Sequence, residues 1–189
     1  MTRRIAIDLL NGLRRRLPLR LARGFARRDD GAAAIEFALV ATPFLALVFA
    51  IMETALVFFA GQTLEAAVTN SSRLILTGQA QTGGLTQATF KQKVCEQIVG
   101  LFDCADKVYV NVQTYTSFSA ASTTPPYNNG QFDTTKMKYQ PGGPGDIVVV
   151  SLYYQWPIYV SLLSNNLDNQ NGNKRLLVAT AAFRNEPYQ

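Results

Sequence analysis

Few residues of this chain could do chemistry, because its 189 residues include no histidine and only two cysteines. Without histidine, neither a Ser-His-Asp nor a Cys-His catalytic arrangement can form. Cys95 and Cys104 supply too few ligands for a metal site, and their eight intervening residues do not fit the Cys-x-x-Cys spacing of redox pairs. No Gly-rich phosphate loop precedes a helix. We therefore expect no enzymatic activity, no cofactor, no metal and no small-molecule substrate.

Two carboxylates, Glu36 and Glu53, stand inside the most apolar stretch of the chain. From Ala32 to Ala60 there are 29 residues with no other charge, and a helix of that length would rise about 43 Å. This exceeds a hydrocarbon core of about 30 Å. The run also lacks the polar face at helical spacing that a soluble helix shows. We predict a transmembrane helix over residues 32–60, kinked or loosened at Pro43.

The net charge of +5 invites a nucleic-acid interpretation, but its distribution argues against one. Residues 1–30 hold nine Arg and three Asp, a charge of +6, and the other 159 residues hold nine basic and ten acidic groups, a charge of −1. A basic leader before an apolar run places the N-terminus in the cytoplasm and the C-terminal part outside. The exported part is near neutral, so we expect no nucleic-acid partner.

The leader itself fits two descriptions. It could lie on the membrane as an amphipathic helix interrupted at Pro18, or it could be a disordered basic tail. An ordinary secretory signal does not explain the apolar run, because such a signal has about 7–15 apolar residues followed by a small-x-small site. The run instead ends in Phe58-Phe59-Ala60-Gly61-Gln62, and its small residues lie at the other end. There, Gly31 precedes Ala32-Ala33-Ala34-Ile35-Glu36-Phe37.

A family resemblance rests on these residues. Glycine, then four residues, then glutamate and an aromatic residue at the head of a membrane helix resembles the processing motif of Flp-type pilins and of TadE-like minor pseudopilins. A Gly-Asp-Ile-Val-Val-Val strand ending near Tyr-x-Trp-Pro, and the closing Phe183-Arg184-Asn185-Glu186-Pro187-Tyr188, also look like the TadE-like domain. The likeness is strong over residues 27–78 and moderate beyond. The long leader and residues 119–146 depart from it.

The resemblance implies that a membrane-embedded prepilin peptidase cuts between Gly31 and Ala32 on the cytoplasmic side, leaving 158 residues. Gly31 has no side chain, so a protease can bind its backbone closely in an extended form. The resemblance also makes Glu36 the carboxylate used in helix assembly and Phe37 the aromatic residue of the motif. The new α-amino group of Ala32, on the same or a neighbouring subunit, is the candidate partner of Glu36. The alternative is that lipid headgroups solvate Glu36.

Beyond Gly61 the sequence predicts one exported α+β domain with a pilin-like plan. The apolar helix should continue to about Gly78, Thr86 should cap a second helix over residues 86–102, and three strands should lie near residues 107–118, 146–156 and 174–188. Because no crossover helix joins these strands, we expect a small antiparallel sheet. The positions expected to face the core are Leu64, Val68, Ile75, Phe90, Val94, Ile98 and Leu101.

Three further expectations concern single features of this part. In an exported domain, Cys95 and Cys104 should form one disulfide that ties the second helix to the following turn. Residues 119–146 should form a long surface loop, which is either a tolerated insertion or a functional segment, with a small hairpin at Asn129-Gly130. Glu53 should lie near the outer headgroups.

The predicted organisation is therefore a leader at residues 1–31, a transmembrane helix at 32–60 and an extracytoplasmic domain at 61–189. The resemblance implies a minor pseudopilin of a tight-adherence (Flp, type IVb) pilus. Its expected location is the cytoplasmic (inner) membrane, crossed once, with the domain in the periplasm or outside. Its expected partners are the prepilin peptidase and other pilins or pseudopilins. The alternative is a permanently anchored domain for binding, adhesion or secretion scaffolding, which would use the loop at 119–146.

Overall fold

The computed structural model describes residues 31–98, 100, 103–128, 130–159 and 173–188. The chain divides into two compact units, Met1–Phe49 and Ala50–Gln189. The described part of the first unit is the beginning of a single long helix, α3 (Ala32–Leu76), which continues into the second unit. Residues 1–30 of the predicted leader and Leu101 lie outside the described residues.

Within the second unit, α3 carries one stripe of buried side chains. Its members follow one another at the helical spacing that places them on one face, and they are Glu53, Val57, Ala60, Leu64, Ala67, Val68, Ser71, Ser72 and Ile75. The predicted inward positions Leu64, Val68 and Ile75 are confirmed, each with no exposed surface. The helix stops where Gly78 takes a left-handed conformation, with a φ of 77°, as glycine often does after a helix end.

Three shorter helices follow, namely α4 (Gln79–Thr82), α5 (Gln87–Glu96) and α6 (Cys104–Lys107). Thr86 caps α5 as expected, because its hydroxyl accepts from the Thr89 N–H while the Thr89 hydroxyl accepts from the Thr86 N–H. However, α5 is shorter than predicted. The Ile98 N–H donates to the Cys95 carbonyl, and this three-residue step tightens the chain into a turn instead of continuing the α-helix.

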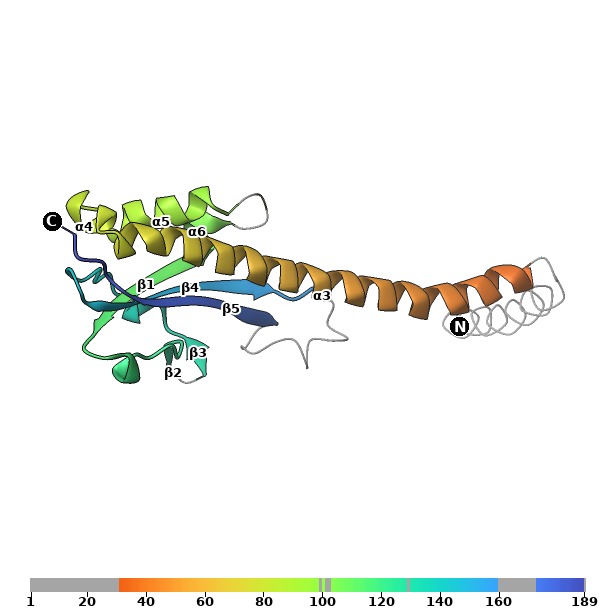
Figure 1. The fold of residues 1–189 in the computed structure, drawn as a ribbon. Coiled ribbons are helices and arrows are strands. Elements are labelled where there is room, and N and C mark those ends of the chain that lie inside the picture. Colours follow the sequence, from red (N-terminus) through yellow and green to blue (C-terminus); the bar gives the residue numbers. More distant parts are fainter. Residues whose placement is uncertain (1–30, 99, 101–102, 129, 160–172, 189) are drawn as a thin grey trace, which may run out of the picture. The chain divides into compact units, whose positions relative to one another are not determined.

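The predicted sheet is confirmed. Its strands are β1 (Val108–Tyr115), β4 (Ile147–Pro157) and β5 (Lys174–Arg184), in the order β1-β4-β5, and both pairs are antiparallel. Alternate side chains of these strands face α3 and α5, which cover one side of the sheet (Figure 1). The fold class is therefore α+β, with a long apolar N-terminal helix, further helices and a three-stranded antiparallel sheet.

The other side of the sheet is covered by the segment that was predicted to be a long surface loop, residues 119–146. It contains two short 3-10 helices, η2 (Phe118–Ala120) and η3 (Thr134–Lys136), and the expected small hairpin, formed by β2 (Tyr127–Asn128) and β3 (Gln131–Phe132). Phe132 is buried, and its ring centroid lies 5.1 Å from that of Tyr153 and 5.5 Å from that of Tyr109. The interpretation of residues 119–146 as a tolerated surface insertion is therefore wrong, because this segment closes a second, smaller core.

Candidate functional site

The predicted cut site lies at the very start of the helix. Gly31 directly precedes α3, whose first residue is Ala32. A Cβ atom added to Gly31 would meet nothing within 4 Å, and the backbone there has no positive φ. The described part of the chain therefore gives no internal reason for a glycine at this position. A requirement for glycine would have to come from outside the described residues, as when another molecule binds this backbone closely.

The motif residues Glu36 and Phe37 lie in the first turns of α3, and both are exposed, Phe37 to 75%. Among the described residues, no donor forms a hydrogen bond or an ion pair with the Glu36 carboxylate. Ala32 and Glu36 are four residues apart, about one helical turn. The structure thus leaves Glu36 available for a group outside this part of the chain, but it does not identify that group.

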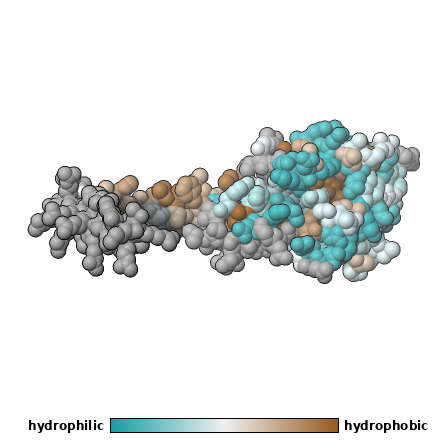
Figure 2. Space-filling model, turned by 180° about the vertical axis from the view of Figure 1, so that it is seen from behind, coloured by the Kyte–Doolittle hydropathy of each residue, from teal (hydrophilic) through white to brown (hydrophobic). Residues whose placement is uncertain are grey.

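The apolar side chains around this motif are exposed as well. Their exposed fractions run from 49% to 75% in the first unit, and they belong to Ile35, Phe37, Leu39, Val40, Phe44, Leu45, Leu47 and Phe49. The most apolar window of α3 has a mean hydropathy of 2.2 and buries none of its residues. By length and composition this helix can cross a membrane once. Figure 2 shows apolar side chains in brown along α3 and mainly teal and white side chains on the folded second unit.

Pro43 lies within α3 and does not end it. Proline has no N–H, so the Leu39 carbonyl lacks its usual helical donor. The neighbouring Thr42 hydroxyl donates to the Ala38 carbonyl at 2.7 Å, which adds a side-chain bond in the same turn. A weakened turn of this kind is tolerated in membrane helices when other groups bond the freed carbonyl.

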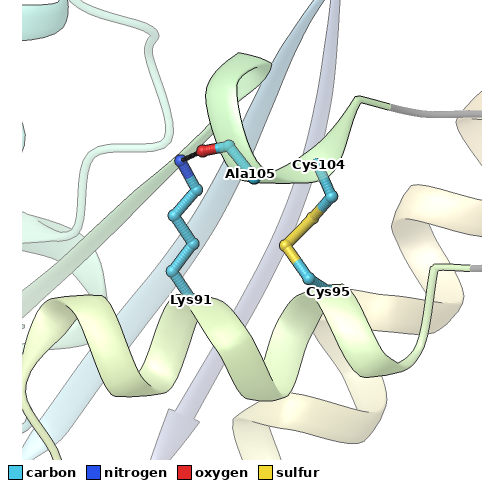
Figure 3. Close-up of a disulfide and its surroundings, with 4 residues drawn as sticks. All are labelled: Lys91, Cys95, Cys104 and Ala105. Atoms are coloured by element: carbon cyan, nitrogen blue, oxygen red, sulfur yellow. Dashed lines mark hydrogen bonds between the residues drawn. A yellow bond between two sulfur atoms is a disulfide. The ribbon is translucent and has the colours of Figure 1, made fainter.

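Cys95 of α5 and Cys104 of α6 form a disulfide, with their Cα atoms 5.6 Å apart (Figure 3). One turn earlier on α5, the Lys91 ammonium donates to the Ala105 carbonyl. Partial burial lowers the pKa of Lys91, and the nearby carboxylates of Asp106 and Asp103 partly offset this by favouring the charged form. The covalent bond and the hydrogen bond together hold α6 against α5, at the point where the chain enters β1.

Glu53 is a site residue whose setting the sequence did not predict. Glu53 is 6% exposed, and its carboxylate accepts a hydrogen bond from the backbone N–H of Tyr159, two residues after the end of β4. A carboxylate that accepts from a backbone N–H forms a charge-assisted bond, which is stronger than a neutral one. Glu53 therefore joins α3 to the end of the central strand inside the second unit instead of lying free on the helix surface. The signal that could have found it is its spacing of four from Val57 on the buried stripe.

The chain's last residues form a second contact set that sequence reasoning missed. Asn185 is 3% exposed, and its side-chain amide donates to the carbonyls of Pro141 and Gly143 at 2.9 and 3.0 Å. The Tyr188 ring lies over Gly78, where any added Cβ would come within 2.2 Å of the ring. These contacts fasten the closing segment to the end of α3 and to the Pro-Gly loop before β4.

Fold and site together define a class of protein, an α+β chain whose N-terminal helix is long and apolar enough to cross a membrane once. Comparison with known families is more specific. The family model described as TadE-like protein matches residues 31–73, from Gly31 into the packed part of α3, and this confirms the resemblance over that segment. Over these residues the chain is similar to the TadE-like family. Comparisons with curated proteins and with solved structures give no match.

Proposed function

We propose that the chain is a minor pseudopilin of a tight-adherence pilus. The TadE-like match implies a role in the assembly of such a pilus. The observation that supports the finer proposal is the exposed, apolar first part of α3, with Gly31 and Glu36 at its head. The role is structural, and the helix itself is the part that other subunits contact.

In this proposal a prepilin peptidase cuts between Gly31 and Ala32, and α3 then begins the mature chain. The helix stays in the cytoplasmic membrane with the second unit outside, or it passes from there into the filament. In hydrocarbon, an unpaired carboxylate is costly. We therefore assign Glu36 to pair with the free α-amino group of Ala32, on the same or on a neighbouring subunit. Packing of the apolar side chains against other pilin helices supplies the remaining contact.

The alternative, a permanently anchored binding domain, loses part of its original support. It relied on residues 119–146 as a free loop, whereas Phe132 of that segment is buried against the sheet. Deleting the segment would uncover Tyr153 and Tyr109, so a loss of function after deletion would not separate binding from folding.

A pair of glycine variants tests the proposal. Gly31→Leu places a large side chain at the cut, and Gly61→Leu is the matched control, because an added Cβ at either glycine meets nothing within 4 Å. We expect Gly31→Leu chains to keep the leader and to be absent from pili, while Gly61→Leu chains are shortened normally. The measurement is the chain length in membrane extracts and in sheared pili. Normal shortening of the Gly31→Leu chain would overturn the proposed cut.

A further inference from the structure

The two outer edges of the sheet differ in how their backbone groups are bonded. β1 and β5 are the edge strands, on either side of the central β4 (Figure 1). In an antiparallel pair, alternate residues of an edge strand bond to the neighbouring strand, and the residues between them point their N–H and C=O groups outward. The hydrogen bonds at the ends of each ladder show which residues point outward.

On β1, the outward-pointing residues are even-numbered, and several of their backbone groups have partners. The Val108 N–H donates to the Cys104 carbonyl, and the Val110 carbonyl accepts from the Gln87 side chain at 2.8 Å. The Val112 N–H donates to the Lys138 carbonyl, and the Val112 carbonyl accepts from the Gln140 N–H. Between Val108 and Val112, the outer edge of β1 is therefore covered by this chain's own residues.

On β5, the outward-pointing residues are even-numbered as well. The Ile158 N–H donates to the Asn173 carbonyl and the Asn185 N–H donates to the Asp146 carbonyl, so odd-numbered positions bond toward β4. The outward backbone groups in the middle of β5 then belong to Val178, Thr180 and Ala182. Among the described residues, none bonds to these outward groups. The edge is also without proline or charge at these three positions, which are the features that usually protect an edge strand.

A second copy of this chain does not fit this edge. Residues 57 and 58 of α3 line one pocket with Leu177, and the Glu186 N–H donates to the Leu76 carbonyl, so α3 and β5 run in the same direction. An antiparallel β5–β5 pair would therefore direct the two copies of α3 oppositely, which a common membrane forbids. A parallel pair about a two-fold axis along the strands would set N–H groups against N–H groups. Pairing of β5 with β1 of the next copy is blocked, because β1 is covered.

We infer that the outer edge of β5 takes an extended strand from a different subunit of the same membrane-anchored assembly. This inference rests on the proposed function, because the common membrane is what excludes the antiparallel self-pair. A strand added to such an edge gains main-chain hydrogen bonds from Val178, Thr180 and Ala182. Lys174 and Arg184 stand at the two ends of β5 and form no ion pair among the described residues. The partner strand is therefore uncharged in its middle and acidic near its ends.

One open and one covered edge have a structural consequence for the assembly. A subunit that accepts a strand on one side only can end a row of subunits but cannot extend it through its sheet. This suits a subunit present in few copies.

Residue-resolved amide exchange on the full chain tests the inference. In detergent, the isolated chain should show fast exchange at Val178, Thr180 and Ala182 and slow exchange at the residues between them. In membranes from cells that make the whole pilus system, exchange at the three outward residues should slow by about fivefold or more, the effect of one net hydrogen bond. In membranes from cells that make this chain alone, it should stay fast.

Two outcomes overturn the inference. Fast exchange at the outward residues in the complete system means that no strand is added. Slow exchange in the chain alone means that a second copy or this chain's own residues cover the edge. Failure of the proposed function gives a different result, because the chain would then stay uncut with its N-terminus at Met1. A chain that is cut and assembled but still exchanges fast at the outward residues contradicts the strand addition alone.

A substitution sharpens the test. Ala182→Pro removes one outward N–H without removing a bond to β4, and Ala182→Val keeps that N–H as the matched control. In the complete system, the proline variant should lose the slow exchange at Val178 and Thr180, and the valine variant should keep it. Slow exchange in a folded proline variant would contradict the inference. If the proline variant does not fold, the residues that bond to β4 exchange fast as well, and the wild-type comparison still decides.

Discussion

Residues 32–49 and residues 50–76 belong to the same helix, yet their side chains meet different surroundings. In the first stretch every large apolar side chain that the structure describes is exposed or half-buried, and Glu36 has no partner there. In the second stretch a periodic face is buried, and Glu53 on that face accepts from the Tyr159 N–H. The two carboxylates lie 17 residues apart in the sequence and have opposite settings.

The difference shows that the residues of one helix are constrained in two ways, by contacts within the chain and by surroundings outside it. The second stretch is under constraint from this chain's own sheet, because its small residues, such as Ala60 and Ala67, allow α3 to lie close to the strands. The first stretch has no such constraint within the described chain, so its apolar character must be explained by something outside it, a membrane and other helices in our proposal. Substitutions in the two stretches should therefore fail in different ways.

The largest expected difference is between two leucines. Leu64→Ala removes a side chain with no exposed surface and should lower the free energy of unfolding of the second unit by about 2–5 kcal/mol. Leu39→Ala removes one that is 70% exposed and should leave it unchanged. Denaturant unfolding of the full chain in detergent, followed by near-ultraviolet circular dichroism, measures both. Equal losses would show that the two stretches are not distinct.

Loss of the disulfide should have the next largest effect. Replacing both Cys95 and Cys104 with Ala frees a short loop in the unfolded chain and should lower the free energy of unfolding by about 2–3 kcal/mol. The change should be confined to the second unit, so the helicity of residues 32–49 should not alter. The same denaturation experiment, with and without reductant on the unchanged chain, is the control. A stable double variant would mean that packing alone holds α6.

The two carboxylates provide a third contrast. Glu53→Ala removes the charge-assisted hydrogen bond that the buried Glu53 carboxylate accepts from the Tyr159 N–H, and it should cost about 1–3 kcal/mol of unfolding free energy. Glu36→Ala should leave that free energy unchanged but reduce the number of pili, because the helix would lose its pairing carboxylate. Glu65→Ala, at another exposed position of α3, is the control for pilus number. Normal pili in the Glu36 variant would contradict the role given to Glu36.

The smallest effect at ordinary pH concerns tyrosines of the second unit. Burial raises the pKa of Tyr153, Tyr154 and Tyr139 above the usual value of 10.0. A folded-state pKa above the unfolded one gives a contribution to stability that is complete below pH 10 and is lost as the pH rises through the folded value. The contribution of these tyrosines to the free energy of unfolding should therefore stay constant up to pH 10 and then fall. The part of the phenolate absorbance that belongs to these three tyrosines should appear together with unfolding, and ionisation of all tyrosines in the folded protein would contradict the prediction.

Most of the fold could be predicted because its signals are local. Leu64, Val68 and Ile75 repeat at helical spacing, Thr86 begins α5 with a side-chain cap, and alternation marks β1. What the sequence could not provide were contacts between distant residues. The acceptor at Glu53 and its donor at Tyr159 are 106 positions apart.

Two further features were missed for the same reason. Phe132 sits in a stretch without periodicity, and only the folded sheet shows that Tyr153 receives its ring. Asn185 bonds to carbonyls more than 40 residues earlier in the chain. Such residues look like ordinary loop or tail residues until the strands are paired. At the head of α3 the situation is reversed, because Gly31 and Glu36 carry a recognisable pattern while the described structure shows no contact that explains them.

The proposed cut is tested most directly by the mass and N-terminal sequence of the chain extracted from membranes of pilus-forming cells. We predict a mature chain of 158 residues that begins at Ala32 and retains the disulfide between Cys95 and Cys104. An intact chain that begins at Met1, in cells whose prepilin peptidase is active on its other substrates, would contradict it.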